Sequence, residues 1–317
     1  MKRHLHQFAL VTAIAGMGMT LPPDAEADEN LLGYVKGAET LPRGASEAYL
    51  WLTRRWDKGI GRYTAYDTEL EYEYGVTSRF TAALALKGQA IDTSGLFIDA
   101  YLPGAEKYGL RPSGIEAKFR YNFLSPAKDD FGLSGQIDLS HAWLDPHSGR
   151  AKDTYSAGFT LLAQKYFLDD QLVMVGNAGF EGTYASRKPL DAATLAGADS
   201  ALQALTGDPA TRFEWPTNPE MELELTFGVG ASYRFAPNWN IGAEVLYQTE
   251  FETGVGQERW SWQAGPSLHY GGRKWWATFT WLPQLRGGGE RYLGQTDNLQ
   301  LVEKTKQEVR LKIGYNF

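Results

Sequence analysis

The chain ends in the nine residues Val309 to Phe317, which read V-R-L-K-I-G-Y-N-F. Every second residue is apolar, and the residues between are polar or glycine: Val309, Leu311, Ile313, Tyr315 and Phe317 alternate with Arg310, Lys312, Gly314 and Asn316. Successive side chains of a β-strand point to opposite faces, so this stretch predicts a strand with one apolar and one polar face. The pattern fits an edge strand of a soluble sheet, and it also fits a strand of a larger all-β structure. The rest of the chain distinguishes these two possibilities.

The same alternation recurs along the whole chain. Counting the last segment, twelve strands are expected near 46–57, 62–74, 79–91, 113–123, 132–143, 153–166, 171–185, 220–235, 239–252, 258–270, 274–284 and 305–317. Most have the roughly 9–11 residues, or slightly more, that cross a bilayer at a tilt. The repeated pattern predicts an all-β fold: a transmembrane antiparallel up-and-down β-barrel of about twelve strands.

The segment 113–123 shows which strand face meets lipid. Glu116, Lys118 and Arg120 share one face, and Ile115 and Phe119 lie on the other. A charge on the lipid face costs about 2–4 kcal/mol at the membrane midplane, and the reversed register would expose three of them. We therefore expect the charged face to line the interior.

The connections between the expected strands alternate in length. Short ones include 168–170 and 236–238, whereas 92–112, 186–219 and 285–304 are long. Barrels of this class place short turns on the periplasmic side and long loops outside. Aromatic residues gather toward both strand ends, for example Trp275 near a short turn and Tyr63 near a loop, as membrane-interface belts require.

Two local features stand out from the regular pattern. Asp191 to Leu205, within the loop 186–219, has apolar residues at helical spacing, so a short helix at the mouth and an irregular ordered loop are both open. Pro266 interrupts a strand and predicts a bulge or kink there.

The N-terminus has the features of an export signal. Met1-Lys2-Arg3 precedes an apolar run from Phe8 to Leu21, and Ala25-Glu26-Ala27 is a small-x-small cleavage site. This combination predicts a secretory signal peptide over residues 1–27 rather than a membrane helix. The segment 28–44 is then assigned to the periplasm, with a plug inside the barrel as the other possibility, and the barrel follows over 45–317.

Composition and histidine placement exclude several function classes. The net charge of −7 argues against a nucleic-acid partner, and the absence of cysteine leaves no disulfide or thiolate chemistry. No metal-ligand spacing is found, and no cofactor is expected. His141, His147 and His269 remain after export; none has a serine placed beside it for attack on outer-leaflet lipid, so we expect no enzyme. Because His141 lies near the outer rim, a lipid-modifying enzyme is retained as a remote alternative.

The inward faces of the expected strands are rich in charge. The pore-lining candidates are Asp67, Glu69, Glu71, Glu73, Glu116, Lys118, Arg120, Glu222, Glu224, Arg310 and Lys312. Since charged side chains set the ion preference of a pore, the acid-rich set predicts a water-filled passage that prefers cations. Alternatively these charges pair with one another and fill the lumen, because twelve strands lie between barrels that fill with side chains and barrels that leave a channel.

Two stretches carry a resemblance to known proteins. A last strand that ends on an aromatic, with another two residues earlier, resembles the closing strand of bacterial outer-membrane β-barrels; this implies Tyr315 and Phe317 as the signal that the barrel-assembly machinery reads. Gly33 to Gly44 and Tyr66 to Thr77 resemble uncharacterised bacterial outer-membrane barrels near those named after a phenol-degradation pathway. This resemblance implies fold and outer-membrane location and brings no substrate or site residues.

Together these features predict a monomeric outer-membrane barrel in contact with lipid, since closure leaves no free strand edge. The expected function is a passive channel or uptake barrel for small neutral or cationic solutes. The alternative is a closed-lumen structural or surface-recognition barrel that acts through the loops 92–112, 186–219 and 285–304. A soluble all-β secreted protein is a weaker possibility.

Overall fold

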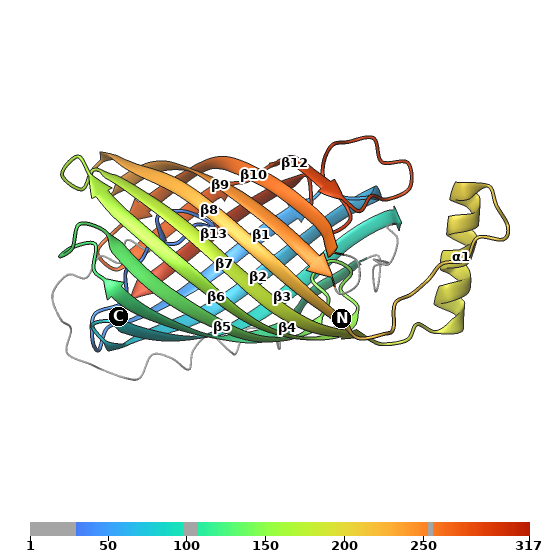
Figure 1. Cartoon of the computed structure of the whole chain (residues 1–317), viewed down its shortest axis with the longest axis horizontal. Coiled ribbons are helices and arrows are strands. Elements are labelled where there is room, and N and C mark those ends of the chain that lie inside the picture. Colours follow the sequence, from blue (N-terminus) through green and yellow to red (C-terminus); the bar gives the residue numbers. More distant parts are fainter. Residues whose placement is uncertain (1–29, 98–106, 253–255) are drawn as a thin grey trace, which may run out of the picture.

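A computed structural model describes residues 30–97, 107–252 and 256–317 of the chain. In these residues one antiparallel sheet curves round and closes on itself, as Figure 1 shows. The expected signal peptide, and the strand connections at 98–106 and 253–255, lie outside the described residues.

The sheet consists of strands that pair in chain order. They are β1 (Ser46–Trp56), β2 (Ile60–Thr77), β3 (Phe80–Phe97), β4 (Lys107–Leu124), β5 (Gly132–Leu144), β6 (Ala151–Phe167), β7 (Leu172–Arg187), β8 (Glu220–Ala236), β9 (Trp239–Glu252), β10 (Gly256–Gly271), β11 (Trp275–Trp281), β12 (Gln284–Gly289) and β13 (Gln307–Asn316). β13 pairs with β1, which closes the barrel. The predicted all-β antiparallel barrel is confirmed.

β11 and β12 are two parts of one barrel strand, so the barrel has the predicted twelve strands. Both pair with β10, and the chain between them breaks at Leu282 and Pro283. The two backbones approach closely beside this break: a Cβ on Gly265 would lie 1.8 Å from the Trp281 carbonyl oxygen. Pro266 itself stays in register with β9, so the irregularity predicted at this proline lies in the neighbouring strand.

β3 and β4 extend further than predicted. The sequence placed a loop over 92–112, but the ladder continues at least to the pair Asp92 and Lys107. Ion pairs from Lys107 (3.1 Å) and Arg62 (2.9 Å) converge on Asp92, so charged residues continue the strands beyond the apolar band. Charge at a strand end marks the edge of the membrane band and not the end of the strand.

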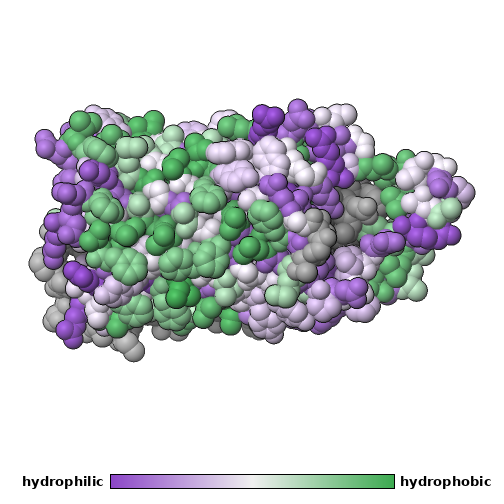
Figure 2. Space-filling model, viewed as in Figure 1, coloured by the Kyte–Doolittle hydropathy of each residue, from purple (hydrophilic) through white to green (hydrophobic). Residues whose placement is uncertain are grey.

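The outer surface carries an apolar band. Figure 2 shows hydrophobic residues across the middle of the barrel and hydrophilic residues at both ends. Large apolar side chains that a soluble protein would bury are exposed here, among them Leu84 (70 %) and Val229 (61 %). Tyr63, expected in an aromatic belt, instead faces inward and is buried, because it shares the parity of the inward acids of β2.

The two ends of the barrel differ. We call the end with the turns 78–79, 168–171 and 237–238 the short-turn end, and the opposite end the loop end. The helix α1 (Ala192–Thr206) lies beyond the loop end (Figure 1); Asp191 caps its first turn, and the left-handed Gly207 ends it. The helical alternative for 191–205 is therefore confirmed. Within the described residues no helix is long and apolar enough to cross a membrane.

Candidate functional site

The charged residues predicted to line the pore all face the lumen, and most of them are paired. Lys118 on β4 is the centre of one group: its ammonium lies 2.5 Å from Glu69 and from Glu71 on β2, and 3.2 Å from Glu116. The Lys118 side chain is almost fully buried. A charge-assisted contact of this length is strong, so this cluster fixes β2 against β4 rather than offering free charge to a solute.

The other predicted residues also have partners. Arg55 holds Asp67 through two hydrogen bonds, the Tyr49 hydroxyl donates to Glu73 at 2.9 Å, and Arg120 donates to Gln136 at 3.0 Å. Two pairs are looser, at 3.8 Å: Glu222 with Lys152 and Glu224 with Lys304. Of the acidic row 67, 69, 71, 73, the first three are thus paired with cations, and Glu73 is hydrogen-bonded by a neutral hydroxyl.

The N-terminal segment 30–44 crosses the inside of the barrel. Asn30 accepts hydrogen bonds from Thr278 on β11 and Lys312 on β13; Lys36 exchanges two with Asn177 on β7; further along, the backbone N–H of Leu41 donates to Thr81 on β3. The segment therefore runs from one wall to the other, nearer the short-turn end. The assignment of this stretch to the periplasm is wrong for the described residues, and the other possibility, a segment inside the barrel, is what the structure shows.

Glu244 on β9 anchors this segment. Its carboxylate accepts hydrogen bonds from the backbone N–H groups of Gly33 (2.8 Å), Tyr34 (2.9 Å) and Val35 (2.8 Å). Ser267 donates a further hydrogen bond at 3.1 Å, and Glu244 is 1 % exposed. Within the described residues the segment has no strand partner, so its backbone N–H groups need other acceptors. The Glu244 carboxylate supplies an acceptor for three of them.

Glycines on the barrel wall leave room for the segment. A Cβ on Gly230 would lie 2.2 Å from a methyl of Leu32, and one on Gly228 would lie 2.9 Å from a methyl of Val35. Leu32 and Val35 are each 1 % exposed and pack with Leu246 and Leu282. The segment is therefore built into the lumen by apolar contact as well as by hydrogen bonds.

Arg310 and Lys312, predicted to line a pore, bind this segment. Lys312 is fully buried and donates to Asn30 and to the Leu32 carbonyl. Arg310 donates to the Gly33 carbonyl at 3.2 Å and stacks on the ring of Tyr34 at 3.8 Å. The alternation of the last strand thus predicted their direction correctly, but not the main-chain groups that they meet.

Two connections fold inward at the loop end. The turn 145–150 is held by Arg55 and Gln89, which donate to the Pro146 carbonyl at 2.8 and 2.6 Å. The connection 290–306 buries Leu301 and Val302, and Glu303 on it lies 3.7 Å from His147 on the turn. These two connections therefore narrow the lumen at the loop end of the barrel.

The ionisable groups at this contact are perturbed by burial. Burial, with the nearby Lys58, lowers the pKa of His147 well below its usual 6.5. Burial and then Arg55 lower the pKa of Lys58 to about 7. For Glu303 burial raises the pKa, but Arg259 and His147 outweigh it and hold the pKa well below 4.5.

Two adjoining cavities remain between the N-terminal segment and the inward loops. We call them the central cavity (320 Å³) and the outer cavity (450 Å³); Tyr34, Trp51 and Leu246 line both. The described residues around them include eight carboxylates, Asp67, Glu69, Glu116, Asp138, Glu181, Glu224, Glu303 and Glu308, and six cations, Lys36, Arg55, Lys87, Lys118, Lys304 and Arg310. The cavity lining is therefore polar and has two more carboxylates than Lys and Arg side chains; His147, which also lines the outer cavity, is not counted.

Trp51 on β1 lies between the cavities and is surrounded by cations. Lys118, Arg310 and Lys312 lie 4.8 to 4.9 Å from its ring centroid, and Lys36 lies at 5.4 Å. Cation–π contact stabilises these charges where water is scarce. Trp51 is not among the predicted pore-lining residues, although its parity with Tyr49 and Thr53 on β1 places it on the inward face.

The histidines and acids of the described residues form no metal centre: no group of three or more could hold an ion. His141 stacks on Tyr155 with ring centroids 4.5 Å apart and lies 3.8 Å from Asp153 at the rim. His269 faces inward and bonds Thr278 at 2.8 Å. Neither geometry brings a serine nucleophile to a histidine on the lipid side.

The closed sheet, the apolar outer band and the charged lumen define an outer-membrane β-barrel of the porin-like class. The chain belongs to a family of unknown function, DUF6662, whose model matches residues 24–317. No curated protein matches it.

Solved structures share the fold at low sequence identity. An outer membrane channel from Pseudomonas putida F1 is similar with a TM-score of 0.56 at 11 % identity, over 88 % of this chain and 98 % of that chain. The β-domain of the Bordetella autotransporter BrkA has a TM-score of 0.49 at 14 % identity, over 86 % and 99 %. At 11 % identity, the similarity to the Pseudomonas putida F1 channel shows a shared barrel fold alone.

Proposed function

We propose that this protein is a narrow outer-membrane channel for small solutes, with a preference for neutral and cationic ones. The observation that carries the proposal is the pair of adjoining polar cavities, of 320 and 450 Å³, lined by two more carboxylates than cations. Net lumenal charge sets which ions enter a pore. The similar channel from Pseudomonas putida F1 supports the proposal at the level of the fold.

In this channel the cation preference does not come from the acidic row of β2. Asp67, Glu69 and Glu71 are held in ion pairs with Arg55 and Lys118, so removal of their charge also takes a partner from those cations. Asp138 and Glu181 are the two acids of the cavity lining that form no ion pair in the described part of the chain, so their charges are the ones that a passing cation can meet.

A second candidate function is a closed barrel that acts through its outer loops. The observation that favours it is the lumen filling: segment 30–44 crosses near the short-turn end, and the connection 290–306 folds in at the loop end. In such a protein the lumenal acids and bases neutralise one another and do not act on a passing solute.

Electrical recording separates the two candidates. The mature chain from Asp28 to Phe317, refolded and placed in planar bilayers under a KCl gradient, should give discrete steps with a cation-directed reversal potential. The double variant Asp138→Asn and Glu181→Gln should move that potential toward zero, while Asp130→Asn, in a short turn, should not. Silence from a barrel that shows heat-modifiable migration would reject the channel and favour the closed barrel.

A further inference from the structure

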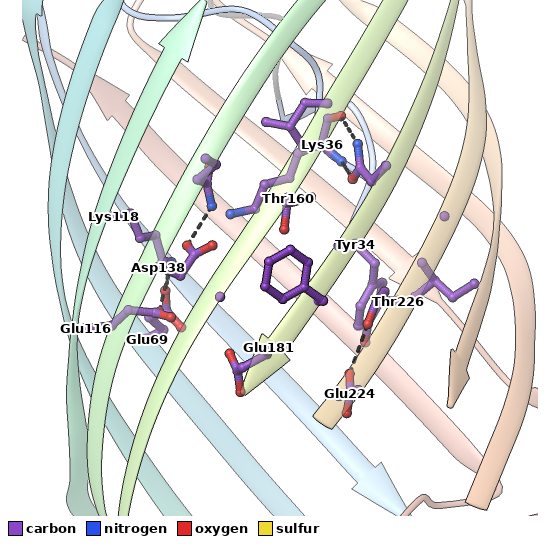
Figure 3. A pocket seen from close by; sticks show the side chains of 18 of the residues that line it. Tyr34, Lys36, Glu69, Glu116, Lys118, Asp138, Thr160, Glu181, Glu224 and Thr226 are labelled. Atoms are coloured by element: carbon purple, nitrogen blue, oxygen red, sulfur yellow. Dashed lines mark hydrogen bonds and ion pairs between the residues drawn. The ribbon is translucent and has the colours of Figure 1, made fainter. Parts of the chain in front are cut away.

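Three charged side chains that line the central cavity form no ion pair within the described residues. They are Lys36, from the N-terminal segment, Asp138 on β5 and Glu181 on β7 (Figure 3). The other charged residues of this cavity are all paired: Lys87 with Glu116 at 3.2 Å, Lys118 with its three carboxylates, and Glu224 with Lys304. The unpaired set is therefore distinct from the structural network of the wall.

The partners that these three groups do have are uncharged. Asp138 accepts a hydrogen bond from Gln136 at 2.7 Å, and Glu181 accepts a long one from Thr183 at 3.4 Å. The Lys36 ammonium lies 5.4 Å from the Trp51 ring centroid, and Figure 3 shows it reaching over the cavity toward Asp138. Charge left without an ion partner in a confined, partly apolar space is costly, and a solute that supplies the opposite charges would lower that cost.

The charges and the apolar lining together define what such a solute must carry. One ammonium calls for a carboxylate, and two carboxylates call for two cationic groups. Tyr34, Trp51 and Leu246 supply apolar contact for a short aliphatic stem between those groups. A simple anion would meet two unpaired acids, and a diamine would leave Lys36 facing another cation.

We propose that the central cavity is a binding station for cationic ampholytes: solutes with one carboxylate and two cationic groups, as in α-amino acids with a basic side chain. The inference rests on the proposed channel function for its role in transport, but the binding itself does not require passage. Lys36 takes the carboxylate, and Asp138 and Glu181 take the two cationic groups.

The test uses the refolded mature chain and four probes of comparable size. These are arginine, its decarboxylated analogue agmatine, glutamate and the uncharged sorbitol. In KCl, arginine should interrupt the current at a concentration at which the other three do not. Lys36→Gln should weaken block by arginine about tenfold, the loss expected for one ion pair, and should leave arginine no better than agmatine.

Two further variants and a binding measurement complete the test. The double variant Asp138→Asn and Glu181→Gln should weaken arginine block by at least as much, whereas Asp130→Asn should leave it unchanged. Heat-modifiable migration shows that each variant is folded. Equal block by all four probes, or an unchanged response of Lys36→Gln, would overturn the inference while the channel stands.

Equilibrium dialysis of labelled arginine against the folded barrel separates the two proposals. Saturable arginine binding that Lys36→Gln removes supports the station even where no current is found, and in that case only the channel function fails. Absence of both current and binding overturns both.

Discussion

At the scale of single residues, Lys118 shows which properties of a side chain the alternating pattern predicts and which it does not. The sequence placed Lys118 and the acids of β2 on the inward face, and the structure has them there. Alternation fixes the face of a side chain but not its height in the barrel, because the stagger between β2 and β4 depends on the whole sheet. The ion pairs, which decide whether a charge is free, therefore could not be predicted.

Substitution of Lys118 tests its structural role. Lys118→Met leaves Glu69 and Glu71 without their cation and close to Glu116, which keeps only Lys87, so we expect the free energy of unfolding to fall by about 3–5 kcal/mol. Urea unfolding of the folded barrel, followed by tryptophan fluorescence, measures the change. Lys128→Met, in the turn between β4 and β5, is the control.

A second substitution should restore part of that loss. In Lys118→Met with Glu71→Gln, one of the uncompensated carboxylates is gone, and the midpoint should recover toward that of the parent. A double variant as unstable as Lys118→Met alone would show that packing, and not charge, is what Lys118 provides.

At the scale of elements, strands were predictable and the inward-folded connections were not. A strand that faces lipid on one side and water on the other must alternate, so twelve strands could be located from sequence. The connection 290–306 and the segment 30–44 have no period, and their places are set by side chains from distant strands, such as Glu244 and Arg310. Inward glycines, Gly228 and Gly230, were the one available signal.

The contact of turn 145–150 with the connection 290–306 should depend on pH through His147. Its pKa is lowered in the folded barrel, so between 6.5 and that lower pKa only the unfolded chain binds the proton. Stability from this group is complete above 6.5 and is lost as the pH falls below it, by up to about 1.4 kcal/mol per pH unit.

Unfolding midpoints at pH 7.0 and pH 5.5 measure this dependence. His147→Gln should reduce the drop between the two values, because the group that takes up the proton is absent. His141→Gln at the rim is the matched control. An identical drop in the parent and in His147→Gln would show that other groups carry the acid sensitivity.

The helix α1 should be dispensable for the barrel. Ala198 and Leu202 pack on Phe213 of the same connection, and Trp215 meets Arg150 and Arg187 at ring distances of 5.7 and 5.9 Å. Replacement of 190–217 by a short Gly-Ser linker should change the free energy of unfolding by less than about 0.5 kcal/mol and leave the conductance unchanged. The same replacement over 291–303, which removes the buried Leu301 and Val302, should alter both.

At the scale of the whole molecule, the N-terminal segment decides how open the barrel is. A twelve-stranded barrel has an interior that side chains alone need not fill. Here the segment 30–44 occupies that space, bound by Glu244 and Lys312 and packed through Leu32 and Val35. The segment therefore restricts the width of the lumen, and through Lys36 it also contributes to the lumenal charge.

A chain that begins at Pro42 should give a wider pore in the same barrel than the chain from Asp28 to Phe317. Removal of 28–41 leaves the strand ladder complete but takes away the segment between the central cavity and the short-turn end, so the single-channel conductance should rise. It also leaves Glu244 and Lys312 without their main-chain partners, so the free energy of unfolding should fall. Glu244→Gln in the chain from Asp28 to Phe317, which weakens the anchor without shortening the chain, should give intermediate conductance with frequent transitions. If both variants conduct as the parent does, the segment lines the passage without restricting it, and the restriction must then lie in the inward loops around His147 and Glu303.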